Sequence, residues 1–227
     1  MKAYLALEDG TVFFGKAIGA SGEAIGELVF DTSITGYENV VTDPNYFSQI
    51  VVMTYPLIGN YGVNRDIISD KPHLKGLVTK EVCKTPSNWR SLETLGDYLK
   101  RNNTVGIEGV DTRLLTLILR EKGTMNAIIS TDENFDFNSV KEKILNYKIN
   151  KPALNVSVKT KEHIEGKGIR IALVDFGVNK NIINSLVKRG CEICRFPAGT
   201  DPEEILDYEP HGIILSNGPG NPEEYDE

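Results

Sequence analysis

Residues 169–222 read IRIALVDFGVNKNIINSLVKRGCEICRFPAGTDPEEILDYEPHGIILSNGPGNP, and this stretch decides the fold of the last part of the chain. Apolar segments that predict strands alternate in it with segments of helical period. In chain order they are a strand over 169–174, a helix over 180–189, a strand over 191–196, a short helix begun by Thr200 or Asp201 with Pro202 in its first turn, and a strand over 212–215. This βαβαβ order predicts right-handed crossovers and an open parallel sheet.

Open parallel sheets bind ligands beyond the carboxyl ends of their strands. The turn Gly218-Pro219-Gly220 stands at such an end, and only its two glycines have an N–H to donate. Two N–H groups in a rigid turn can face a developing negative oxygen, which is what an oxyanion hole requires. The same turn is also typical of a tight bend that merely ends a strand.

Asp175 follows the first of these strands, within Asp175-Phe176-Gly177. A full Gly-x-Gly-x-x-Gly pattern is absent, so a nucleotide site is not favoured. We expect Asp175 to order its loop or to cap the helix that follows.

Three cysteines are present, and none has the context of a catalytic or metal-binding residue. Cys191 and Cys194 have C-x-x-C spacing, but residues three apart on a strand point to opposite faces, and no second ligand pair exists. We expect both in the core. A structural role is likewise expected for Cys83, although a histidine distant in sequence could meet it in space.

Residues 1–152 predict an α+β domain with a β-rich start, because short apolar strands separated by turns come first and helices come later. The expected strands are 3–7, 11–17, 27–32 and 49–55. The expected helices are 91–101, a second one that Asp111 or Thr112 caps and Gly123 ends, and 139–147. The polar stretch 153–168 predicts a linker, followed by a second domain over 169–227. Asp43-Pro44-Asn45 is a turn by composition, and Asn45 could offer its amide to a polar ligand.

The 227 residues carry a net charge of -7, a pI near 5.2 and 40% hydrophobic residues. These values are typical of a folded globular protein and disfavour nucleic acid and anionic membrane surfaces as partners. Three cysteines do not make a disulfide framework, and no signal-peptide core opens the chain. We therefore expect a cytoplasmic protein.

Several long motifs resemble one family, the small subunit of carbamoyl-phosphate synthase. They span nearly the whole chain in order: LALEDGTVFFGKAIGA, FDTSITGYENVVTDPNY, TYPLIGNYGVN, PSNWRSLETLGDYLK, GVDTRLLTLILREKG, LVDFGVNKNII and LSNGPGNP.

The resemblance implies a glutaminase whose second domain is a doubly wound, class I glutamine amidotransferase. In the family a cysteine attacks the amide of L-glutamine, with a histidine and a glutamate completing the triad. The first domain docks on a large subunit, which uses the released ammonia with bicarbonate, ATP and magnesium to make carbamoyl phosphate for arginine and pyrimidine synthesis. The resemblance implies no cofactor in the small subunit itself.

By position, Gly218 and Gly220 match the glycines that line the family's glutamine site and its oxyanion hole. Asn45 stands where many members have a serine that touches glutamine across the domain boundary. The family's nucleophile lies in a Gly-x-Cys-x-Gly context that this sequence does not contain. The resemblance therefore places the triad beyond Glu227, in a longer protein, and the 227 residues alone are expected to be inactive. A short, non-catalytic docking homologue is the rival interpretation, and an unrelated nucleotide-binding domain is a third.

Overall fold

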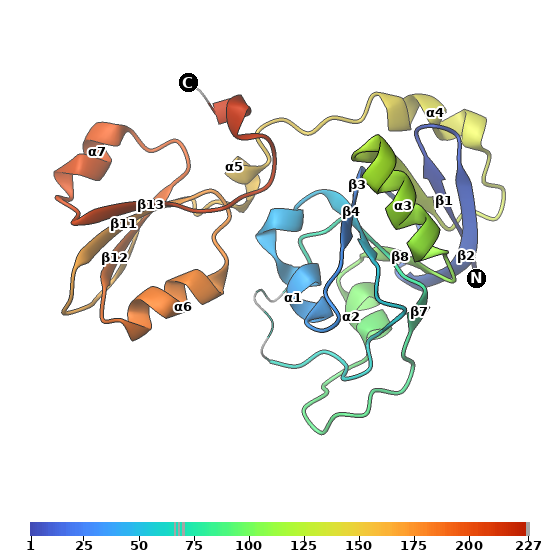
Figure 1. Cartoon of the computed structure of the whole chain (residues 1–227), viewed down its shortest axis with the longest axis horizontal. Coiled ribbons are helices and arrows are strands. Elements are labelled where there is room, and N and C mark those ends of the chain that lie inside the picture. The colour runs from blue at the N-terminus through green and yellow to red at the C-terminus, as the bar shows by residue number, and fades with distance from the viewer. Residues whose placement is uncertain (66, 68, 70, 226–227) are drawn as a thin grey trace. The chain divides into compact units, whose positions relative to one another are not determined.

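The computed structural model describes residues 1–65, 67, 69 and 71–225 and divides into two compact units, Met1–Lys148 and Ile149–Glu227. Each unit has its own sheet and its own hydrophobic core. They are described one at a time below (Figure 1).

Seven strands of the first unit close into a barrel. In barrel order they are β1 (Lys2–Leu7), β2 (Val12–Gly19), β8 (Val105–Glu108), β6 (Gly76–Val78), β4 (Gln49–Met53), β3 (Glu23–Asp31) and β9 (Met125–Ser130). Alternate side chains point inward, so Ala3, Leu5 and Leu7 of β1 join the core while Lys2 and Tyr4 face outward.

The sequence pattern predicts a mixed α and β unit with an early run of strands, but not a closed barrel. Three of the barrel strands, β6, β8 and β9, come from stretches that were left unassigned. They have only three to six residues and are almost wholly buried, so they lack the alternation of polar and apolar residues that reveals a strand.

Helices and two short strands complete the first unit. They are α1 (Tyr37–Thr42), the 3₁₀ turn η1 (Pro44–Tyr46), β5 (Leu57–Ile58), which pairs with β7 (Glu81–Val82), α2 (Leu95–Arg101), α3 (Thr112–Lys122) and α4 (Phe137–Leu145). α3 begins as predicted, because the Asp111 carboxylate accepts the N–H of Leu114 at 3.0 Å, and it ends at Gly123, whose φ is 85°.

The predicted start of α2 was wrong. Thr94 caps the helix by accepting the N–H of Asp97. Residues 91–93 therefore lie before the helix. Leu92, whose spacing from Leu95 and Leu99 predicts a place on the same buried helix face, is 63% exposed. The capping hydroxyl therefore decides the boundary, although the leucine spacing continues beyond it.

The second unit has a four-stranded sheet in the order β10-β12-β11-β13. Its strands are β10 (Glu162–Ile164), β11 (Arg170–Asp175), β12 (Glu192–Pro197) and β13 (Gly212–Leu215), and the last three are parallel as predicted. Residues 153–168, expected as a linker, contain α5 (Ala153–Val156) and β10, which pairs antiparallel with β12. β10 is short and largely polar because it lies at the sheet edge, so its composition predicted a connector.

The two main helices of this unit cover opposite faces of the sheet (Figure 1). α6 (Lys180–Lys188) packs through Ile182 and Leu186 on the face that carries Ile171 and Leu173. α7 (Pro202–Asp207) packs through Ile205 on the other face. One helix per face fits an amidotransferase-like α/β domain, while the complete doubly wound sheet stays a prediction. Among the described residues, no helix is long and apolar enough to cross a membrane.

Acid should weaken the first unit through His73. Burial, followed by the positive charge of Lys71, lowers the pKa of His73 from 6.5, so the unfolded chain takes up a proton at higher pH than the folded chain. This stabilising contribution is present above pH 6.5 and is lost as the pH falls through the lower folded pKa. We expect His73→Gln to lose less stability than the wild type between about pH 7 and about pH 5, measured by urea unfolding at each pH. Parallel curves for the two proteins would contradict this assignment.

Candidate functional site

The site is built around Asp175, at the carboxyl end of the central strand β11. Its side chain is fully buried, and one carboxylate oxygen accepts the N–H groups of Gly177 at 3.0 Å and Val178 at 2.8 Å. The other oxygen accepts the N–H of Val158 at 2.7 Å and pairs with Arg195 of β12 at 2.8 Å. The prediction that Asp175 orders its loop is confirmed.

Ser216 ties the end of β13 to the end of β11. Its Oγ accepts the N–H of Phe176 at 2.9 Å and donates to the carbonyl of Asn217 at 2.7 Å, while its own N–H donates to the carbonyl of Val174. The loops after the two strands are thereby joined edge to edge. Ser216 lies within the LSNGPGNP motif, but nothing in the sequence pattern pointed to this bond.

Gly218 and Gly220 lie in one loop after β13, and packing requires both to lack a side chain. A Cβ on Gly218 would lie 2.2 Å from the carbonyl oxygen of Phe176. A Cβ on Gly220 would lie 2.6 Å from the ring of Pro152, and the φ of Gly220 is 93°, which L side chains rarely adopt. The backbone bends at Pro219 and Gly220, and its packing alone accounts for both glycines.

This packing does not use the N–H groups of the loop. Within the part of the chain that the structure describes, neither the Gly218 N–H nor the Gly220 N–H donates a hydrogen bond to a protein acceptor. Gly218 is half-buried and Gly220 is exposed. The loop can therefore present two rigid backbone donors to an anionic or carbonyl oxygen of a ligand.

The 3₁₀ turn η2 (Pro222–Tyr225) follows the glycine loop and contacts the residues on which the loop packs. The Tyr225 hydroxyl accepts the N–H of Ala153 at 2.9 Å, and its ring meets Phe176 edge to face with centroids 5.8 Å apart. Burial raises the pKa of Tyr225, so the phenol stays neutral at ordinary pH. Nothing in the sequence pattern pointed to this residue.

Cys191 and Cys194 are core residues, as predicted. They are 5% and 0% exposed and belong to two different core clusters, one on each face of the sheet. Burial raises the pKa of the Cys194 thiol, which keeps it from acting as a nucleophile. Neither sulfur can take the place of a catalytic cysteine.

Asn45 and Cys83 belong to the first unit. The N–H of Asn45 donates to the Asp43 carboxylate at 2.9 Å and its side-chain amide donates to the same oxygen, so the predicted turn is confirmed. Contact between Asn45 and glutamine stays a prediction. Cys83 is half-buried and its thiol donates to the carbonyl of Thr85 at 3.3 Å. No group of three or more His, Cys, Asp or Glu side chains suited to a metal ion occurs among the described residues.

Two protein families match the chain, one in each unit. The family described as "Carbamoyl-phosphate synthase small chain, CPSase domain" matches residues 5–129, more than half of the chain. The chain belongs to the carbamoyl-phosphate synthase small-chain family. The family described as "Glutamine amidotransferase class-I" matches residues 172–227, which hold β11 and the glycine loop.

Curated members of the small-chain family are similar along almost the whole chain. The carbamoyl phosphate synthase small chain of Clostridium perfringens is 47% identical over 100% of this chain and 65% of its own length. The small chain of Fusobacterium nucleatum is 48% identical over 97% of this chain and 62% of its own length. The carbamoyl phosphate synthase pyrimidine-specific small chain of Bacillus subtilis is 44% identical over 100% of this chain and 63% of its own length. The chain thus spans less than two thirds of the length of these relatives.

Among solved structures, an aminopeptidase from Aneurinibacillus covers 89% of this chain and 50% of its own, with 14% identity and a TM-score of 0.36. A likeness at this level carries no argument about fold or function.

Loss of Asp175 should open the second unit. Asp175→Ala would leave three backbone N–H groups and Arg195 without their acceptor, a class of change that costs about 3 kcal/mol or more. We expect the amides of β11 and β12 to exchange with solvent about 100-fold faster, measured by hydrogen exchange with mass spectrometry.

Glu162→Ala is the matched control, because Glu162 pairs with the same Arg195 at 3.0 Å but is half exposed. Glu162→Ala should lower the free energy of unfolding by less than about 1 kcal/mol. Equal acceleration in the two variants would refute the role given to the buried carboxylate.

Proposed function

We propose that this chain is part of the glutamine-hydrolysing subunit of a carbamoyl-phosphate synthase. The observation that carries the proposal is the glycine loop at the tip of β13, whose two N–H donors are free of protein acceptors in the described structure. Family membership supports the same assignment. The reaction assigned to the whole protein is hydrolysis of L-glutamine to glutamate and ammonia.

In this proposal the N–H groups of Gly218 and Gly220 stabilise the oxyanion that forms when the carbonyl of the glutamine amide is attacked. Such donors act when they are held in place before the reaction, since no energy is then spent on aligning them. Gly218 is held against Phe176, and Gly220 against Pro152. Asn45 is assigned a contact with glutamine, for which its side-chain amide can both donate and accept.

The nucleophile is assigned to residues outside these 227. The sequence contains no Gly-x-Cys-x-Gly motif, and the two cysteines of the second unit lie in its core. The 227 residues by themselves are therefore proposed to be inactive. The partner is a large subunit that joins ammonia with bicarbonate and ATP, with magnesium, to give carbamoyl phosphate for arginine and pyrimidine synthesis, and no cofactor is assigned to this subunit.

A docking module without chemistry is the second candidate. It is favoured by the lack of an accessible thiol in the described part of the second unit. The two candidates differ in one measurement: the complete gene product either releases ammonia from L-glutamine when the large subunit is present, or binds the large subunit without doing so.

Gly220→Ala should lower glutaminase turnover of the complete gene product by about 100-fold, because its Cβ would push against Pro152 and displace a donor. Ammonia release from L-glutamine is the measurement. Gly199→Ala is the control, since Gly199 has nearly the same φ, 92°, yet a Cβ there would meet no atom within 4 Å. Turnover that falls equally in both variants, or in neither, would count against the oxyanion role.

A further inference from the structure

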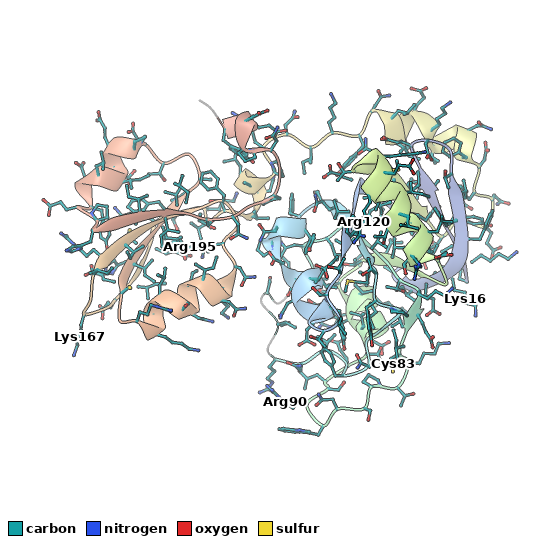
Figure 2. The ribbon with its side chains drawn as sticks, in the orientation of Figure 1. Lys16, Cys83, Arg90, Arg120, Lys167 and Arg195 are labelled. Carbon is teal, nitrogen blue, oxygen red and sulfur yellow. The ribbon has the colours of Figure 1, made fainter. Side chains whose placement is uncertain are left out.

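A broad groove crosses the outside of the barrel where β1 and β2 run past the segment 80–85. It encloses about 1090 Å³ and lies entirely within the first unit. Two glycines, Gly15 and Gly109, are among its lining residues. Figure 2 shows Lys16 and Cys83 on this side of the unit, near β2 and β7.

Four lysines line the groove, against two glutamates: Lys2, Lys16, Lys80 and Lys84 against Glu81 and Glu108. All four lysines are exposed, and within the described residues none of them forms an ion pair. The chain as a whole has a net charge of -7. A cluster of unpaired positive charge therefore stands on an otherwise acidic protein.

Two of these lysines are cross-strand neighbours. Lys2 of β1 is directly opposite Lys16 of β2 in the antiparallel register, and like charges in that position repel. On its other side Lys16 is opposite Glu108, but that carboxylate accepts the N–H of Val82 at 3.2 Å. Lys2 and Lys16 therefore place two ammonium groups side by side in the groove.

Aromatic surface lies beside the charges. Phe14 is opposite Tyr4 on the same outer face, with ring centroids 5.7 Å apart, and Phe14 is 71% exposed. The groove walls are also fixed, because the Gly109 N–H donates to the carbonyl of Lys80 at 2.9 Å. An exposed aromatic ring beside several lysines suits an interface in which complementary charges select and orient the partner.

We infer that this groove is the docking surface for an acidic segment of the large subunit. The inference rests on the docking role proposed above and adds its place and chemistry. Carboxylates of the partner segment pair with the lysine ammonium groups, and an apolar side chain of the segment packs on Phe14. A small anion fits less well, because the lysines are all exposed and the lining is spread over several strands rather than gathered around one point.

The test measures binding of the complete gene product to the purified large subunit of the same organism by isothermal titration. The variant is the double reversal Lys16→Glu and Lys84→Glu, and the control is the double reversal Lys100→Glu and Lys141→Glu, two exposed lysines of the same unit that lie on α2 and α4. We expect the groove variant to bind about 100-fold more weakly and with a smaller salt dependence, and the control to change affinity less than about threefold.

A carbodiimide, which joins an ammonium group to a carboxylate in contact with it, gives an independent readout on the unaltered proteins. Mass spectrometry should find groove lysines linked to Asp or Glu of the large subunit. Normal binding by the groove variant, or equal losses in both variants, would overturn the groove assignment alone. Absence of any binding by the wild-type chain would instead overturn the docking function on which it rests.

Discussion

The second unit depends on a charge that has no access to water. A buried carboxylate is costly unless donors surround it, and Asp175 collects four of them from three separate stretches of chain. Those donors fix the end of β11, the neighbouring strand β12 and the segment before β10 relative to one another. Phe176, the next residue, is the surface against which the glycine loop rests. The position of the loop is therefore set by an ion that need not touch a ligand.

The glycine loop shows that a structural and a functional interpretation of one motif can both hold. Lack of a Cβ lets Gly218 lie against a carbonyl and lets Gly220 adopt a positive φ beside a proline ring. Lack of a protein acceptor leaves their N–H groups for a ligand. The same feature that closes the turn tightly also prepares the donors, so no separate strain is needed to build them.

Sequence reasoning succeeded where a local rule decides the structure. The order of β11, α6, β12, α7 and β13, the cap at Asp111 and the opposite burial of Cys191 and Cys194 all follow from periodicity or capping. It failed where distant pairing decides. The closed barrel depends on strands of three to six residues, and the role of Arg195 depends on a partner 20 residues away on another strand. The glycine loop could be recognised from its sequence motif, but the two residues that hold it in place, Ser216 and Tyr225, could not.

Cys191 and Cys194 are buried on opposite faces of the sheet, so their reactivity reports on how tightly the second unit is packed. Their sulfurs belong to cores on opposite faces, so they cannot form a bond with each other while the strand keeps its place. A reagent in solution reaches the fully buried sulfur of Cys194 only when the layers around it separate. The rate at which a thiol reagent modifies Cys194 in native buffer thus measures how often the second unit opens locally.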